Sequence, residues 1–149
     1  MILPIDNTQT YLIRQEVLRK GKPIETCHFD GDTEKNTIHF GFFHHGHIVG
    51  VVSVFKSNST LFYEKLQFQI RGMAVVKDYQ HKGFGNQLLF HAENYCKEQY
   101  GNIIWLNARE KAVPFYEKND YQILGESFEI PEVGNHFVSF HKIICTFII

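Results

Sequence analysis

The most informative stretch of this chain is Gln80-His81-Lys82-Gly83-Phe84-Gly85. It separates an expected strand at residues 67–75 from an expected helix that begins near Phe84. Its two glycines let the backbone turn tightly and come close to a ligand. Amides at a helix start point outward with the positive end of the dipole, and Lys82 and His81 add charge beside them. The stretch therefore predicts an anion site and favours a pyrophosphate.

Taken alone, a pair of glycines at a helix start is also ordinary turn chemistry, and both interpretations stay open at this point. The dinucleotide-binding pattern Gly-x-Gly-x-x-Gly is not met, because Leu88 stands where the third glycine belongs. A Walker loop is excluded as well, because no Gly-Lys-Ser/Thr follows.

Downstream of this stretch the hydrophobic period becomes helical. Apolar side chains recur on one helix face at Phe84, Leu88, Ala92 and Tyr95. Gly101, directly after Tyr100, is the expected C-cap of this helix. Residues 103–106 then predict a short, continuously apolar strand that is buried on both faces.

The rest of the chain supplies antiparallel pieces on either side of this strand–helix–strand crossover. A hairpin with Gly46 in its turn is expected from residues 37–43 and 48–55. The remaining expected elements are a first helix that follows Asp6-Asn7-Thr8 and runs to about Leu18, a short helix at 113–118, and strands at 121–128 and 137–148. The fold class is therefore α/β (α+β), with a mixed sheet and flanking helices.

Composition bounds the function. The 149 residues are 44% hydrophobic and 21% charged, which suits a single globular domain over residues 1–149. Fifteen Lys and Arg against sixteen Asp and Glu give a formal net charge of -1, so no nucleic-acid partner is expected. Cys27, Cys96 and Cys145 form no Cys-x-x-Cys pair and predict reduced thiols. No signal peptide or bilayer-length apolar run is present, so a cytoplasmic protein with no membrane partner is expected.

Two further positions are candidates for ligand contacts. Asn107 ends the expected central strand, and Tyr116 lies on the next short helix. An amide and a phenol there can hydrogen-bond a ligand in the gap between two strands. The alternative is that Tyr116 is a core aromatic whose hydroxyl is satisfied internally. The His-rich turn at residues 44–47 has no accompanying Cys or carboxylate at sensible spacing, so no metal site is expected.

In order and spacing, these pieces resemble the GNAT superfamily of acyl-CoA N-acyltransferases. Met73-Ala74-Val75 looks like the end of that family's fourth strand, and the stretch 80–85 is similar to its Gln/Arg-x-x-Gly-x-Gly/Ala loop. Residues 107–118 look like its fifth strand and following helix. One departure is Asn119-Asp120-Tyr121, where the family commonly has Leu-Gly-Phe or Leu-Gly-Tyr. Asn and Asp tolerate the left-handed conformation that glycine supplies there.

The resemblance implies an N-acetyltransferase that uses acetyl-CoA as co-substrate and needs no metal, with a mostly antiparallel central sheet. The segment Met73-Ala74-Val75 would pair with the pantetheine arm, and the Val75 amide would be the oxyanion donor. Asn107 would bind the pantetheine from the other side, and Tyr116 would act on the thioester sulfur as general acid. The pyrophosphate would lie on the amides of Gln80, His81, Lys82, Gly83, Phe84, Gly85 and Asn86.

Several questions stay open at the level of sequence. The acceptor is an amine of a small molecule or peptide, and a homodimer is compatible with the Phe-rich composition. Candidates for the general base, by residue type, are Glu25, Glu34, His39 and His136. A basic group, expected to be solvated but close to the acceptor site, consists of Arg14, Arg19, Lys20 and Lys22. The competing hypotheses are a catalytically degenerate acyl-CoA-binding or interaction module of the same fold and, less favoured, a nucleotide-binding regulatory domain.

Overall fold

The computed structural model describes residues 1–144, so Cys145 and the expected continuation of the last strand to residue 148 lie outside the described residues. The chain divides into two compact units. The first contains Met1–Lys56 and Ile70–Tyr95, and the second contains Ser57–Gln69 and the residues from Cys96 onward. Along residues 1–144, no helix has both the length and the apolar character needed to cross a membrane.

Within residues 1–144, seven strands form a mixed, mostly antiparallel sheet, which confirms the expected fold class. Their hydrogen-bonded order is β1-β2-β3-β4-β5-β7-β6, and β4 contributes residues to both units. The pairs β1–β2, β2–β3, β5–β7 and β6–β7 are antiparallel, whereas β4 and β5 are parallel.

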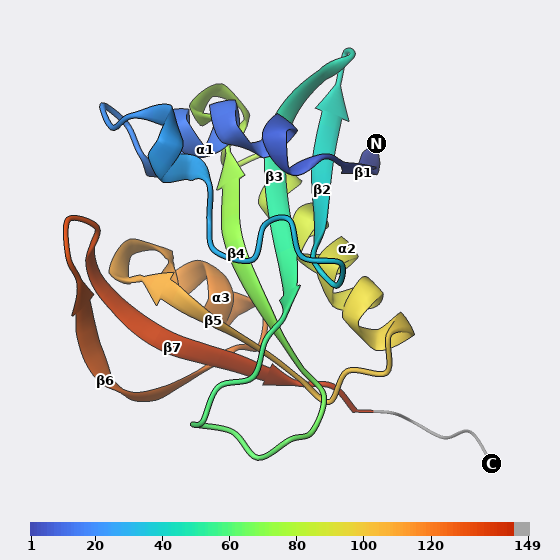
Figure 1. The fold of residues 1–149 in the computed structure, drawn as a ribbon, viewed down its shortest axis with the longest axis vertical. Coiled ribbons are helices and arrows are strands. Elements are labelled where there is room, and N and C mark those ends of the chain that lie inside the picture. The colour runs from blue at the N-terminus through green and yellow to red at the C-terminus, as the bar shows by residue number, and fades with distance from the viewer. Residues whose placement is uncertain (145–149) are drawn as a thin grey trace. The chain divides into compact units, whose positions relative to one another are not determined.

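The first unit is built on the hairpin that the sequence predicts. Its elements are β1 (Ile2–Ile5), α1 (Tyr11–Leu18), β2 (Ile38–His44), β3 (His47–Lys56), the end of β4 (Gln67–Val75) and most of α2 (Phe84–Glu98). Figure 1 shows β2 and β3 as the two arms of the hairpin, with β4 beside β3. The strand β1 was not predicted, because it is short and contains Pro4, which lacks an N–H and is tolerated at a sheet edge.

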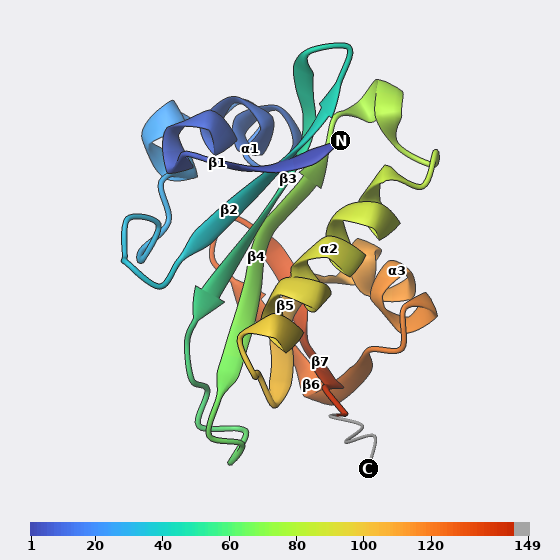
Figure 2. The same ribbon diagram turned by 90° about the vertical axis from the view of Figure 1, so that its right-hand side faces the viewer.

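Side chains of β3 alternate between two helices of this unit. Val51 packs with Ile13 of α1 and Ala74 of β4 in one core cluster. Gly50 faces the other way, where a Cβ would lie only 2.8 Å from Leu88 of α2. Figure 2 shows α1 and α2 on opposite faces of these strands, so the strands of the first unit are covered on both sides.

The second unit contains β5 (Ile103–Arg109), α3 (Val113–Lys118), β6 (Gln122–Ile130) and β7 (Gly134–Lys142). Ile103 and Ile104 are fully buried, which confirms the expected strand with two covered faces. The boundaries of all three strands differ from expectation, and β6 is shifted only slightly, from 121–128 to Gln122–Ile130. The strand β5 continues past Asn107 to Arg109, and β7 begins at Gly134, so that His136 lies inside a strand.

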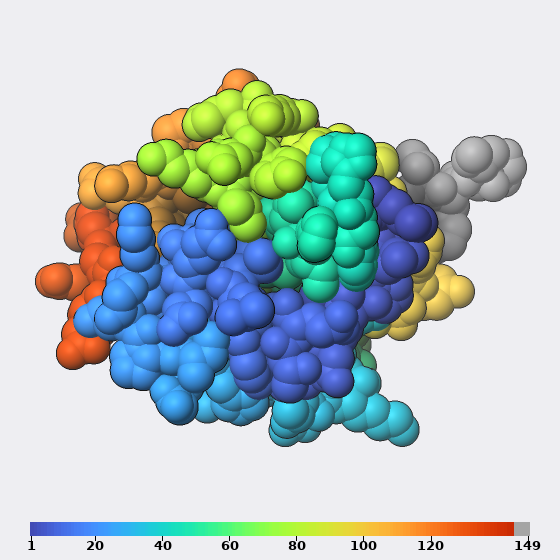
Figure 3. All heavy atoms as spheres, turned by 90° about the horizontal axis from the view of Figure 1, so that it is seen from above, coloured from blue at the N-terminus to red at the C-terminus, as the bar shows by residue number. Residues whose placement is uncertain are grey.

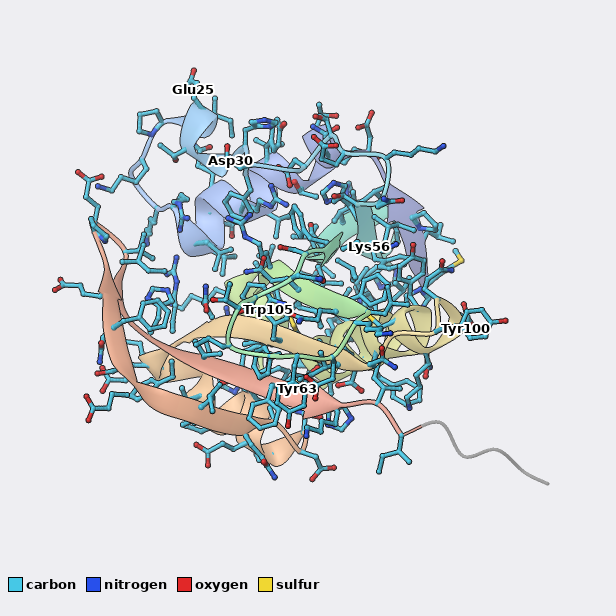
Figure 4. The ribbon with its side chains drawn as sticks, turned by 60° about the horizontal axis from the view of Figure 1, so that its bottom comes forward. Glu25, Asp30, Lys56, Tyr63, Tyr100 and Trp105 are labelled. Carbon is cyan, nitrogen blue, oxygen red and sulfur yellow. The ribbon has the colours of Figure 1, made fainter. Side chains whose placement is uncertain are left out.

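The end of α2 corrects the expected cap. Tyr100, not Gly101, has the left-handed backbone, with φ of 60°. The Gly101 amide bonds the Cys96 carbonyl (2.9 Å) and the Tyr100 amide bonds the Lys97 carbonyl (3.0 Å), the two bonds of a Schellman motif. Gly101 is required for space instead, because a Cβ there would lie 2.8 Å from the Phe68 ring. Tyr100 therefore adopts the strained left-handed conformation, and its side chain projects outward, as Figure 4 shows.

Candidate functional site

The loop between β4 and α2 is tied to the strand end that precedes it. The Gln80 side chain donates from Nε2 to the Val75 carbonyl over 2.8 Å. The Val76 amide donates to the Val49 carbonyl of β3 over 2.9 Å. The loop therefore leaves the sheet at a fixed point, directly after the residues that the resemblance assigns to the pantetheine.

The backbone of this loop has the form expected of an anion site. His81 and Gly83 have left-handed backbones, with φ of 59° and 84°. The helix bond from the Gln87 amide to the Gly83 carbonyl (3.1 Å) makes Gly83 the N-cap of α2, which begins at Phe84. The amides of Phe84 and Gly85 then belong to the first turn, where the helix offers them no acceptor. Apart from Gly83 and its neighbours along the chain, no atom of residues 1–144 lies within 4 Å of a Cβ built on Gly83, so the space beside this residue is open.

Aromatic side chains anchor the loop between β4 and α2 to the hairpin of β2 and β3. The ring of Phe84 stacks on Phe42 of β2 at 4.4 Å between centroids, and Tyr79 stacks on Phe84 at 6.0 Å. His44, at the end of β2, contacts both Tyr79 (5.3 Å) and Phe84 (5.6 Å). Figure 3 shows the hairpin tip beside the segment that leads into α2. Phe84 can therefore contribute its amide to a ligand while its side chain anchors the loop, and Lys82 remains exposed.

The end of β4 is buried and irregular. Ala74 and Val75 are 4% and 9% exposed, so a ligand there would meet mainly their backbone. Gly72 has a φ of 62° just before Met73, and a Cβ on it would lie 2.9 Å from Arg14 Nε and 3.0 Å from the Phe29 ring. This glycine lets β4 lie directly on Arg14 and Phe29.

Asn107 and Tyr116 belong to the second unit. Asn107 is exposed on β5, whereas Tyr116 on α3 is only 8% exposed. Burial raises the pKa of Tyr116 well above its ordinary value, so its hydroxyl stays protonated at neutral pH. Asp120 has a φ of 68° and ends α3 in a second Schellman motif. This confirms that Asp120 takes the left-handed conformation in place of the expected glycine.

Arg14 is fully buried, which corrects its expected place on a solvated basic face. Its guanidinium donates two hydrogen bonds to Asp32, from Nη1 to Oδ2 (2.6 Å) and from Nη2 to Oδ1 (3.0 Å). It also donates to the Cys27 carbonyl (2.7 Å) and the Ser53 hydroxyl (2.9 Å). Burial would raise the pKa of Asp32, but the bonds from Arg14 and the Phe29 amide outweigh it and hold the pKa below its usual value.

The same network contains His39, which is buried and was a candidate general base. Its Nε2 must donate to the Asp32 carbonyl (2.9 Å), because a carbonyl only accepts. Its Nδ1 therefore accepts from the Ser53 hydroxyl (2.6 Å). Burial lowers the pKa of His39, and the nearby Arg14 charge lowers it further, against the opposing effect of Asp32. Both ring nitrogens are engaged, so this geometry does not support His39 as the base.

The other three candidate bases differ in their exposure to solvent. His136 is buried in β7, and its Nδ1 donates to the Gly134 carbonyl over 2.7 Å, so Nε2 is the nitrogen that can take a proton. Glu25 and Glu34 are exposed, and Figure 4 shows Glu25 directed outward. Among residues 1–144, no three His, Cys, Asp or Glu side chains are grouped closely enough to hold a metal ion.

Comparison with known proteins finds relatives of this chain in sequence and in fold. Residues 22–141 match the family model described as an acetyltransferase (GNAT) domain. The chain is 34% identical over 131 residues to YitI, an uncharacterized N-acetyltransferase of Bacillus subtilis strain 168, with 88% of each protein covered. The fold is similar to an aminoglycoside 6′-N-acetyltransferase in complex with coenzyme A (TM-score 0.76, 14% identity, 97% of each chain). It is also similar to a putative N-acetyltransferase from Lactobacillus plantarum (TM-score 0.79, 14% identity, 97% of this chain and 98% of that one).

Proposed function

Because this chain belongs to the acetyltransferase (GNAT) family, we propose that it transfers an acetyl group from acetyl-CoA to a primary amine of a small molecule or peptide. The observation that carries the proposal is the loop from Gln80 to Gly85. It combines open space beside Gly83, two left-handed residues and first-turn amides at the start of a long helix. This is the backbone arrangement that suits a pyrophosphate.

The cofactor half of the proposed site lies in the first unit. The amides of residues 80–86 would hold the pyrophosphate, with the exposed charge of Lys82 beside them. The pantetheine arm would pair with the backbone of Met73 and Val75, in the manner of an added strand. Asn107 is the proposed second contact of the pantetheine.

The proposed reaction is direct attack in a ternary complex. The neutral amine nitrogen forms a bond to the thioester carbonyl carbon, and the negative charge that develops on oxygen is stabilised by the Val75 amide. Collapse of this intermediate breaks the C–S bond and releases the thiolate of CoA. The ammonium proton passes to a base, for which His136 stays a candidate because its Nδ1 donates to the Gly134 carbonyl and leaves Nε2 as an acceptor.

We assign Tyr116 to the leaving sulfur. Burial raises the pKa of its hydroxyl, while a free thiol has a pKa of about 8.5. Full proton transfer from this phenol to the thiolate is therefore uphill. The role that its protonation supports is donation of a hydrogen bond to the sulfur as negative charge develops on it.

The experiment is release of free CoA thiol from acetyl-CoA, followed with a thiol reagent against a panel of amines and peptides. We expect turnover with at least one class of primary amine and none with acetyl-CoA alone. Tight binding of acetyl-CoA without turnover on any amine would instead support the degenerate binding module.

A further inference from the structure

Three arginines surround one buried aromatic ring in the first unit. The guanidinium carbons of Arg14, Arg71 and Arg19 lie 4.0, 4.9 and 5.4 Å from the centroid of Phe29. Arg14 lies in α1, Arg19 is the residue directly after α1, and Arg71 lies in β4, so two segments far apart in the sequence bring like charges together. Phe29 itself is 7% exposed.

Only one of these charges is neutralised. Arg14 is paired with Asp32 in the network described above. Arg19 donates to the Leu18 carbonyl (3.3 Å), and Arg71 donates to the Asp30 carbonyl (3.1 Å). Within residues 1–144, neither Arg19 nor Arg71 forms an ion pair. A guanidinium carries five N–H donors, so both have donors to offer a ligand.

The charges of Arg19 and Arg71 therefore have no paired carboxylate in the part of the chain that the structure describes. Burial lowers the pKa of Arg71, and the charges of Arg14 and Arg19 lower it further, against the opposing effects of Asp32 and Asp30. A cation–π contact with Phe29 attracts each guanidinium but supplies no counter-charge. A bound carboxylate or phosphate would supply that charge and accept the unused donors in a planar fork.

The position of the cluster connects it to the acceptor. The proposed pyrophosphate loop follows Val75, so the proposed pantetheine path runs back along β4, from the loop toward Met73. Arg71 lies two residues before Met73 and four before Val75, whose amide is the proposed oxyanion donor, so the cluster lies on the same strand as the proposed acyl site. Gly72 between them lies against Arg14 and Phe29, which joins this part of β4 to the cluster.

We propose that Arg19 and Arg71, held against Phe29, bind an anionic group of the acceptor, so that the substrate class is a primary amine carrying a carboxylate or a phosphate. This inference rests on the proposed function for the position of the acyl group. Arg14 is a positioning residue, because the donors on its two Nη atoms are committed to Asp32, Cys27 and Ser53.

The test uses pairs of amines in which one member carries an anion and the other a neutral group, with rates compared per concentration of unprotonated amine. We would measure kcat/KM for amino acids against their carboxamides, and for phosphoethanolamine against ethanolamine. The wild type should prefer the anionic member of at least one pair by about tenfold or more, as expected for a charge-assisted hydrogen bond. Arg71→Gln and Arg19→Gln should each remove most of that preference by lowering kcat/KM for the anionic member alone. Arg71→Lys, which keeps the charge but not the fork, should give an intermediate value.

Lys56→Gln is the matched control, because it removes the same charge from an exposed position in the same unit (Figure 4). It should leave the preference unchanged, and thermal unfolding of each variant checks that it folds. Equal kcat/KM for the anionic and neutral members in the wild type would overturn the proposal. An equal loss of kcat/KM for the anionic and the neutral member in Arg71→Gln and Arg19→Gln would overturn it as well. If only the amino acids show the preference, the site binds a carboxylate; if only phosphoethanolamine shows it, the site binds a phosphate.

A binding measurement keeps this inference distinct from the proposed function. Calorimetric titration with N-acetyl amino acids and their amides, in the presence of CoA, needs no turnover. If no amine is acetylated, the proposed function fails, while tighter binding of the acids that is lost in Arg71→Gln still supports the anion site. Equal binding of acid and amide overturns it.

Discussion

Among substitutions that preserve side-chain size, Asp32→Asn should cause one of the largest losses in the free energy of unfolding of this protein. Asp32 and Arg14 both have side-chain exposures of 0% and share two hydrogen bonds. The change removes the counter-charge but leaves the guanidinium buried. Breaking a buried pair in this way costs about 3–5 kcal/mol. Two charge-assisted hydrogen bonds at about 1.5–3 kcal/mol each lead to the same range.

The expected loss is large beside the whole stability of a domain, which is about 5–15 kcal/mol. The matched control is Asp30→Asn, because Asp30 is exposed and only two residues away. It should change the free energy of unfolding by no more than about 0.5 kcal/mol. The double variant Arg14→Leu with Asp32→Asn should lose less than the two single variants added together, since no unpaired charge is left buried.

Equilibrium unfolding in urea provides the measurement. Trp105, the only tryptophan of the chain, lies in the second unit, whereas Asp32 lies in the first. Its fluorescence should therefore be followed together with far-UV circular dichroism, which reports both units. A loss for Asp32→Asn that is within about 1 kcal/mol of the loss for Asp30→Asn would refute the reasoning, since 3–5 kcal/mol is the cost of an unpaired buried charge.

The same pair predicts a pH dependence. The native pKa of Asp32 is held below its ordinary value of 3.8, so above that pH the carboxylate contributes its full stabilisation. As the pH falls below 3.8 and through the native pKa, the contribution is lost. The difference in unfolding free energy between the wild type and Asp32→Asn should therefore be constant near neutrality and shrink in acid.

Three further changes test the site and the fold. Tyr116→Phe should lower kcat by about a hundredfold and change acetyl-CoA affinity little. The control Tyr121→Phe, at a buried neighbouring tyrosine, should leave kcat unchanged. Equal values of kcat in the two variants would show that Tyr116 does not have the proposed role. Gly83→Ala and Gly125→Ala meet similar left-handed strain and equally open space, with φ of 84° and 76°. Only Gly83→Ala should weaken acetyl-CoA binding, by about tenfold or more in calorimetry; matched losses would show strain alone. Tyr100→Gly should raise the free energy of unfolding by about 1 kcal/mol, because it relieves a φ of 60° at an exposed position. A lower stability in urea would contradict that explanation.

Much of the fold follows from patterns within about ten residues. The strand Gln67–Val75, the start of α2 at Phe84 and the helix Val113–Lys118 have the predicted boundaries. Side-chain period and turn chemistry are properties of the local backbone, so a sequence displays them directly. The left-handed Asp120 is predictable for the same reason, since few residue types tolerate that conformation.

The proposed cofactor loop, residues 80–85, was predicted in part from the sequence and depends in part on tertiary contacts. Its glycines and its place between a strand and a helix are visible in the sequence, and the structure adds the Gln80 bond to Val75 and the stacking of Phe84 on Phe42. The cap of α2 shows how tertiary contacts override local preference. A glycine stands beside Tyr100, yet Gly101 is needed against the Phe68 ring, and Tyr100 takes the strained conformation instead.

The sequence alone predicted the hairpin, the strand–helix–strand crossover and a loop proposed to bind a pyrophosphate, but not β1. Only the tertiary structure decided that Arg14 is buried with Asp32, and that Arg19 and Arg71 meet over Phe29. Arg14 lies 18 residues from Asp32 and 39 from Ser53. A charge is solvated or buried according to which distant segments fold against it, and local periodicity carries no information about those partners.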